Sequence, residues 1–195
     1  MSPDIEVLIQ KISRLPGLGP RSARRIVIHL IQHNDDILEP MLRSLGKVHE
    51  NVKTCPICGN VDTFKDVCSI CSDESRNKEI ICVVENVTDL WAIERTSCFN
   101  GYYHVLQGLL SSISGQGPEV LLLDKLSERC KNNNVKEIII ALSATVEGQT
   151  TDYYIKNYFK ETTIKVSSLA HGIPMGGELD YLDDGTLFTA FSARK

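Results

Sequence analysis

The sequence predicts an α/β protein in which a helical N-terminal segment and a small cysteine module precede a mostly parallel sheet. Three observations support this prediction. Two helical apolar stripes flank a Pro- and Gly-rich turn at residues 15–20, two C-x-x-C pairs lie between residues 55 and 71, and strand-like apolar runs alternate with helical stretches after residue 78. A short C-terminal segment completes the chain.

Composition and charge narrow the class of protein. The 195 residues are 42% hydrophobic and 24% charged, and no apolar run approaches the ~20 residues of a membrane span. The acidic N-terminus lacks the pattern of a signal peptide, so we expect a cytoplasmic protein with no membrane partner. The net charge is −4, but residues 1–54 hold eight Lys or Arg against six Asp or Glu. A basic region on an acidic protein is typical of contact with nucleic acid at one surface.

Three helices are expected in the first segment. Ser2 and Pro3 suit a helix start, and an apolar stripe at helical spacing carries that helix to about residue 15. Pro20 opens a second helix that runs to about His33, and a third is expected from Asp36 to Lys53. The first two helices and their turn form a helix–hairpin–helix.

The turn between the first two helices has the features of a phosphate site. Gly17 and Gly19 allow close approach of the backbone to a ligand, and the N-terminal end of the second helix favours an anion. The arginines around it are Arg14, Arg21, Arg24 and Arg25. Since the helix dipole disfavours cations at that end, a bound polyanion such as a DNA backbone explains them. The alternative is a simple connector surrounded by solvated arginines.

The two cysteine pairs predict a metal centre. Cys55 and Cys58, followed by Cys68 and Cys71, provide the four thiolates of a closed tetrahedral zinc site. The few large apolar residues between them are too small a set to order the segment unaided, so zinc is expected to be structural, with one ion per chain. A disulfide or redox role suits this spacing less well, while ligand type alone also allows an iron–sulfur cluster. The remaining thiols, Cys82, Cys98 and Cys130, are expected to be small buried hydrophobes.

From Lys78 onward, strands and helices alternate, which predicts a mostly parallel sheet with helices on both faces. The expected strands are residues 80–84, 102–106, 136–142 and 163–166. The expected helices are 86–95, 117–130, 150–159 and 184–194, and residues 172–177 are expected to form a loop. Trp91, Tyr103 and His104 are expected in the core, and His29 and His33 are not expected to bind metal.

Two acids lie where the first and third of these strands end. Glu85 follows the first strand, and Glu147 follows the third within the segment 143–148. Carboxyl ends of parallel strands meet at one edge, where α/β proteins place their sites. Two carboxylates at positions 143 and 145 would complete a Mg²⁺ site there, but the chain carries Ser143 and Thr145. We therefore do not expect a catalytic centre. Glu85 and Glu147 are either solvated acids at strand ends or part of an acidic docking surface for a basic partner.

Six motifs together make the whole chain resemble the RecR family of bacterial recombination mediators. They are residues 15–25 (LPGLGPRSARR), the cysteine quartet, 83–85 (VVE), 101–108 (GYYHVLQG), 145–148 (TVEG) and 171–178 (HGIPMGGE). One departure is His171, where the family usually has Arg. The resemblance implies a helix–hairpin–helix domain at 1–53, a four-cysteine zinc finger at 54–76, a Toprim-like domain at 77–172 and a C-terminal oligomerisation segment at 173–195.

What the resemblance implies for function is a protein that is not an enzyme. Members form rings, expected to be tetramers of two dimers, that clamp DNA without reading its sequence. They act with RecO and RecF to load RecA onto single-stranded DNA, and the acids Glu85 and Glu147 would dock RecO. The alternative is a metal-dependent Toprim nuclease or topoisomerase-like enzyme, which requires the acids that are absent from positions 143 and 145.

Overall fold

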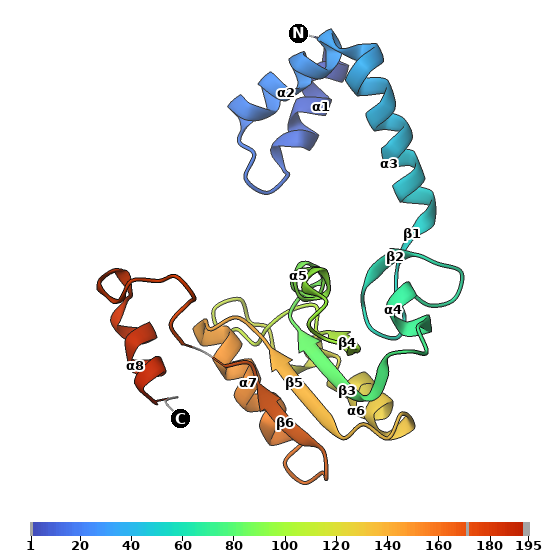
Figure 1. The fold of residues 1–195 in the computed structure, drawn as a ribbon. Helices are drawn as coiled ribbons and strands as arrows, with labels where there is room; N and C mark the ends of the chain where they lie inside the picture. Colours follow the sequence, from blue (N-terminus) through green and yellow to red (C-terminus); the bar gives the residue numbers. More distant parts are fainter. Residues whose placement is uncertain (1, 171, 193–195) are drawn as a thin grey trace. The chain divides into compact units, whose positions relative to one another are not determined.

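A computed structural model describes residues 2–170 and 172–192. The chain divides into two compact units, residues 1–52 and residues 53–195. Each unit is described by itself (Figure 1).

The first unit is all helical. It contains α1 (Pro3–Ser13), α2 (Pro20–Gln32), a single π-helical turn η1 (Asn34–Leu38) and α3 (Glu39–Asn51). Prolines occupy the first turns of α1, α2 and α3, where the missing amide costs no hydrogen bond. The predicted third helix begins three residues late, because the turn at 34–38 has π geometry and the regular α-helix starts at Glu39.

A small core joins α1 to α2. Its buried members are Ile9, Ala23 and Val27, against which Ile5, Leu8 and Ile12 of α1 pack. These are the residues of the predicted apolar stripes. On α3, by contrast, the apolar residues Met41, Leu42, Leu45 and Val48 are all exposed.

The cysteine module joins the helical unit to the sheet. Two short strands, β1 (Val52–Thr54) and β2 (Val61–Thr63), pair with each other, and α4 (Ser69–Ser72) follows. The module does not form an independent domain, because Ile70 and three of the four cysteines belong to the same buried cluster as the core of the sheet. It is therefore part of the second unit.

The main sheet is four-stranded and entirely parallel. Its strands are β3 (Asn77–Val84), β4 (Gly101–Val105), β5 (Glu137–Ala141) and β6 (Lys165–Ser168), in the order β4-β3-β5-β6. The last residue of β3, Val84, pairs with Val105 on one side and Ala141 on the other. This register brings the carboxyl ends of the three strands to one edge, as the sequence predicted.

The helices of this unit are α5 (Val87–Thr96), α6 (Leu123–Asn132) and α7 (Val146–Tyr158), with a short 3₁₀ turn η2 (Pro118–Leu121). The step from β3 to β4 runs opposite to the steps from β4 to β5 and from β5 to β6. Right-handed crossovers therefore place α5 on one face, and α6 and α7 on the other (Figure 1).

Two helix boundaries of the second unit also differ from prediction for local reasons. The helix expected from 117 to 130 is broken at Leu122, whose φ is +48°. The helix expected from Thr150 begins at Val146, because the Thr145 side chain accepts a hydrogen bond from the Gly148 amide and caps it.

The C-terminal segment contains a 3₁₀ turn η3 (Leu179–Tyr181) and the helix α8 (Asp184–Ser192). The predicted loop at 172–177 is confirmed, whereas His171 and the end of the predicted last helix at 193–194 lie outside the described residues. Within the described ranges, no helix has the length and apolar character to cross a bilayer.

Two predictions of burial are wrong. Trp91 on α5 is 51% exposed, and Cys98 is exposed in the turn after that helix. Tyr103, His104, Cys82 and Cys130 are buried as predicted.

Candidate metal centre and nucleic-acid interface

The hairpin turn is held by backbone geometry that requires glycine. The amide of Leu18 donates to the carbonyl of Leu15 at 3.1 Å, and Gly17 between them has a φ of +76°. Gly19 is the N-cap of α2, in an extended conformation that any residue can adopt. A Cβ added at Gly17 or Gly19 would meet no atom within 4 Å. The turn therefore presents open backbone to its surroundings.

Amides and arginines are free around this turn. Helix geometry leaves the amides of Arg21 and Ser22 without an intrahelical acceptor, and Gly19 has no side chain to cap them. The predicted set Arg14, Arg21, Arg24 and Arg25 is exposed. None of these four forms an ion pair with any residue in the ranges 2–170 and 172–192. The unit thus concentrates donors and positive charge where the helix dipole attracts anions.

The four predicted cysteines converge. The Sγ atoms of Cys55, Cys58, Cys68 and Cys71 lie within 4.8 Å of one another, and those of Cys58 and Cys68 are 3.5 Å apart. Four sulfurs bound to one zinc at about 2.3 Å lie roughly 3.8 Å apart in a tetrahedron. The cluster therefore has the size of a zinc site.

The backbone around the cluster also fits a metal. The amide of Asn60 donates to Cys58 Sγ at 3.4 Å, after a tight turn in which Gly59 has a φ of +81°. Thiolates are the form of cysteine that binds a metal, so a dication bound to all four sulfurs would displace their protons.

The module is fastened to the sheet at several points. The Val105 amide donates to the Cys58 carbonyl at 2.8 Å, and a Cβ at Gly59 would lie 3.0 Å from the Val105 Cβ. The Trp91 indole donates to Asn60 Oδ1 at 3.0 Å, and the Tyr102 hydroxyl donates to the Asp73 carbonyl at 3.1 Å. The exposed Trp91 thus lies over the module instead of in the core.

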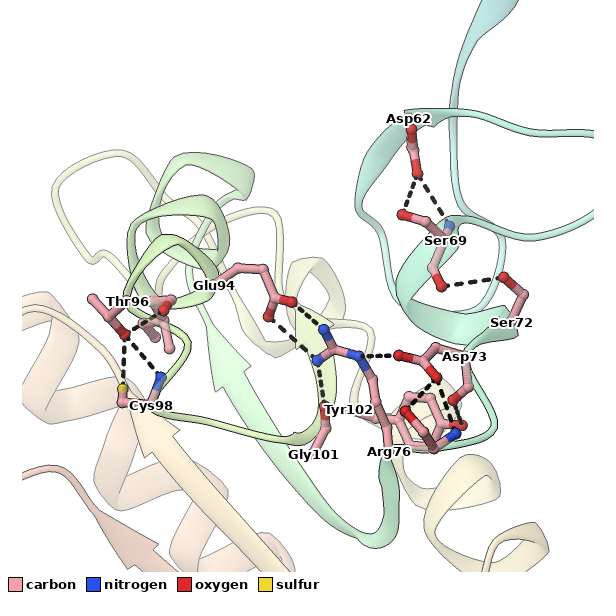
Figure 2. Close-up of polar contacts among 12 residues, drawn as sticks. Asp62, Ser69, Ser72, Asp73, Arg76, Glu94, Thr96, Cys98, Gly101 and Tyr102 are labelled. Carbon is pink, nitrogen blue, oxygen red and sulfur yellow. Dashed lines mark hydrogen bonds and ion pairs between the residues drawn. The ribbon is translucent and has the colours of Figure 1, made fainter.

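Arg76 joins the end of the module to α5 and β4 (Figure 2). Its guanidinium pairs with Glu94, lies 3.5 Å from Asp73, and donates to the Gly101 carbonyl at 3.1 Å. The side chain is only 11% exposed. Sequence reasoning missed this residue, since no pattern marks which arginine will be buried.

The edge of the sheet holds the two predicted acids. Glu85 is half-buried directly after β3, and burial, with a smaller effect of Asp89, raises the pKa of its carboxyl. Glu147 is half-buried in the first turn of α7. Within the described residues, the cysteine cluster is the only group of three or more His, Cys, Asp or Glu whose ligand atoms converge.

Hydroxyl groups occupy the positions between these acids. Ser143 Oγ and Thr145 Oγ1 are 3.1 Å apart, and Thr145 caps α7. Ser143 also lines a cleft of about 450 Å³ to which Phe188 of α8 contributes an aromatic wall. Positions 143 and 145 therefore provide hydroxyl groups at the sheet edge in place of carboxylates.

Comparison with known proteins finds matches along most of the chain. Family models match at residues 5–48 (RecR, helix-hairpin-helix), 52–73 (the RecR zinc finger domain with four cysteine ligands), 79–170 (Toprim domain) and 172–195 (RecR, C-terminal). Recombination protein RecR of Rhodospirillum rubrum is 53% identical over 98% of this chain and 97% of its own. The chain belongs to the RecR family. RecR of Sinorhizobium fredii is 50% identical over 98% of this chain and 95% of its own, and RecR of Rhizobium rhizogenes is 51% identical over the same shares.

Membership in the RecR family agrees with the fold and the metal chemistry. The order of helix–hairpin–helix, four-cysteine zinc finger and Toprim domain is confirmed, and the four converging cysteines form a structural zinc site. Four thiolates close the coordination shell, so this zinc holds the module together and leaves no position for a substrate. The chain is a DNA-recombination protein of this family.

Proposed function

We propose that this RecR-family protein grips the sugar–phosphate backbone of DNA through its hairpin and serves as a recombination mediator without altering covalent bonds. The observation that carries the proposal is the hairpin of the first unit. Open glycine backbone, free helix amides and four exposed arginines without ion pairs among the described residues lie around the turn between α1 and α2. Contacts of this kind position a protein on phosphates and carry no sequence information.

Weak binding by one hairpin is a reason for assembly. A chain with about four cations at the hairpin neutralises few phosphates, so its affinity falls steeply with salt. Several hairpins on one DNA bind more tightly through effective concentration. A ring of four chains, expected for this family, would provide them.

Exposed apolar surface supports self-association. On α3, Met41, Leu42, Leu45 and Val48 recur at helical spacing and are exposed. In the C-terminal segment, Leu179, Tyr181 and Phe188 are exposed as well. Apolar surface of this extent on a polar protein is typical of interfaces between subunits.

The acidic edge is the proposed docking surface for RecO. Glu85 and Glu147 are half-buried at the carboxyl ends of β3 and β5, which are neighbours in the sheet. A partner with complementary positive charge would be steered to this edge. With RecF, this contact would allow RecA to be loaded on single-stranded DNA.

A Toprim enzyme is the less favoured alternative. Mg²⁺ prefers charged oxygen ligands, whereas Ser143 and Thr145 offer hydroxyls, one of which caps a helix. Incubation of DNA with the protein and Mg²⁺ or Mn²⁺ should leave the strands intact. Nicking that disappears in Glu85→Gln would establish the enzymatic alternative.

The test of the main proposal compares two double variants in the same unit. Arg21→Ala/Arg25→Ala removes two hairpin cations, and Arg43→Ala/Lys47→Ala removes two cations from α3, one of them already paired with Glu39 at 3.1 Å. Anisotropy of a labelled single strand, titrated over a salt series, should show roughly tenfold weaker binding and a shallower salt slope for the first variant. Equal affinities and slopes for both variants would refute the hairpin as the DNA site.

The mediator role needs a functional measurement. The ATPase of RecA on single-stranded DNA coated with single-strand-binding protein should rise when this protein, RecO and RecF are all present. Arg21→Ala/Arg25→Ala should abolish the rise, and Glu85→Gln/Glu147→Gln should abolish it while DNA binding persists. A full rise with both variants would contradict the proposed division of roles.

A further inference from the structure

Arg129 of α6 is a buried cation without an acidic partner. Arg129 is only 8% exposed to solvent, and no carboxylate within the described residues lies at ion-pair distance from its guanidinium. Taking a guanidinium out of water is costly unless other groups compensate for the charge. The compensation must therefore come from what surrounds it.

The surroundings are the metal module and β4. One guanidinium nitrogen, Nη2, donates to Cys71 Sγ at 3.9 Å, and the other, Nη1, donates to the carbonyl of Tyr103. The guanidinium carbon lies 5.5 Å from the centre of the Tyr102 ring. A carbonyl and an aromatic face attract a cation but carry no net charge. Among these three partners, only Cys71, as a thiolate, carries one.

Charge balance at the zinc centre explains the contact. Four thiolates around one Zn²⁺ leave a net charge of −2 in a site where three ligands are buried. Cys71 is the ligand with the greatest solvent exposure, and Arg129 is the side chain that reaches it from the α/β domain. A guanidinium hydrogen bond to a thiolate offsets that charge and fixes the orientation of the ligand.

We propose that Arg129 is a positioning residue of the zinc centre, which holds Cys71 on the metal and ties zinc retention to the folded sheet through the Tyr103 carbonyl. If so, the zinc finger of this protein depends on a side chain of α6, which lies 58 positions after the last zinc-binding cysteine. This inference does not rest on the proposed DNA-clamping function.

The first measurement is the rate at which zinc passes to a chromogenic chelator. Arg129→Gln should lose zinc roughly 10- to 100-fold faster than wild type, the range typical of outer-shell substitutions. Arg129→Lys keeps a charge but not the two-pronged donor, so its rate should be intermediate. Arg95→Gln, an exposed arginine on α5, is the matched control and should match wild type.

A second measurement separates this role from simple loss of packing. In the Co²⁺-substituted protein, loss of a hydrogen bond to one thiolate should move the thiolate-to-metal charge-transfer band to lower energy. The Arg129→Gln variant is also followed in a thiol-alkylation time course by mass spectrometry. In this variant, Cys71 should react before the other three ligands, Cys55, Cys58 and Cys68, and before the buried Cys130. General loosening would instead expose Cys130 together with the ligands.

The proposal is overturned by folded Arg129→Gln that keeps the wild-type rate of zinc loss and the wild-type cobalt spectrum. The proposal is also overturned if alkylation of Arg129→Gln modifies Cys130 as early as Cys71. Should Arg129→Gln fail to fold, the same comparison is made with Arg129→Lys, for which an unchanged rate and spectrum overturn the proposal equally.

Discussion

The two units use arginine in opposite ways. Around the hairpin, Arg21 and its neighbours are exposed and form no ion pair within the described residues. In the second unit, Arg76 and Arg129 are largely buried, and each donates to a backbone carbonyl and to a negatively charged or sulfur group. The difference shows that charge left unpaired on the surface serves an external anion, whereas charge taken inside holds structural modules together.

The largest expected effect concerns the zinc ligands of the second unit. Cys55→Ser should remove a ligand and with it most of the folding free energy of the module, on the order of 10 kcal/mol for zinc-finger peptides. Metal analysis should fall from about one zinc per chain to near zero, with protease cleavage appearing within residues 53–76. Cys98→Ser, an exposed thiol outside the cluster, should change neither. Full folding of Cys55→Ser without metal would contradict a structural zinc.

A pH profile tests the interior charge environment of the second unit. His104 is 3% exposed, and neither ring nitrogen has a hydrogen-bond partner among the described residues. Burial, with Arg129 and Lys125 nearby, lowers its pKa to about 4. Below about pH 6.5, His104 is protonated in the unfolded chain but stays neutral in the folded chain. The free energy of unfolding should therefore fall by about 3 kcal/mol as the pH drops from 6.5 toward 4.

Urea unfolding at a series of pH values, with zinc content followed in parallel, checks this expectation. His104→Gln should flatten the part of the decline that is not due to zinc loss, and the exposed His29→Gln should keep the wild-type profile. Equal slopes for His104→Gln and wild type would show that folding does not lower the pKa of His104.

Arg76 provides the direct contrast with a hairpin arginine. Arg76→Ala should lower the free energy of unfolding of the second unit by about 2 kcal/mol, because charged hydrogen bonds to Glu94 and Gly101 are lost. Arg24→Ala should leave stability within about 0.5 kcal/mol of wild type, since Arg24 is exposed and unpaired among the described residues. The comparison fails if both substitutions have the same effect on urea unfolding.

The smallest expected effects separate backbone strain from ligand approach at the hairpin. Gly17→Ala should cost about 1 kcal/mol, because its φ of +76° is unfavourable for a residue with a Cβ. Gly19→Ala should cost about 0.5 kcal/mol, because alanine is a poorer N-cap than glycine. It should also weaken DNA binding, since its Cβ would project into space that is open in the protein. Thermal unfolding and anisotropy measure the two effects, and unaltered DNA affinity for Gly19→Ala would argue against close backbone approach.

Local signals in the sequence were sufficient for the order of elements. The alternation of apolar runs after Lys78 predicted a parallel sheet, which is confirmed, and the two C-x-x-C pairs predicted the converging cysteines. Both patterns work because neighbouring residues determine them: strand burial follows a continuous apolar run, and a C-x-x-C turn directs two sulfurs to one point. The DNA-contacting residues of the hairpin and the roles of Glu85 and Glu147 remain proposals.

Spacing within short stretches of the chain was enough to predict the helix–hairpin–helix, the zinc ligands and the succession of strands and helices. Packing between distant elements established the rest: Trp91 lies exposed over the cysteine module, Arg76 clamps this module to α5, and Arg129 reaches Cys71. These contacts join residues that are 18 to 58 positions apart. Which arginine is buried depends on how elements from distant parts of the chain pack together. The charges of neighbouring residues in the sequence therefore cannot predict it.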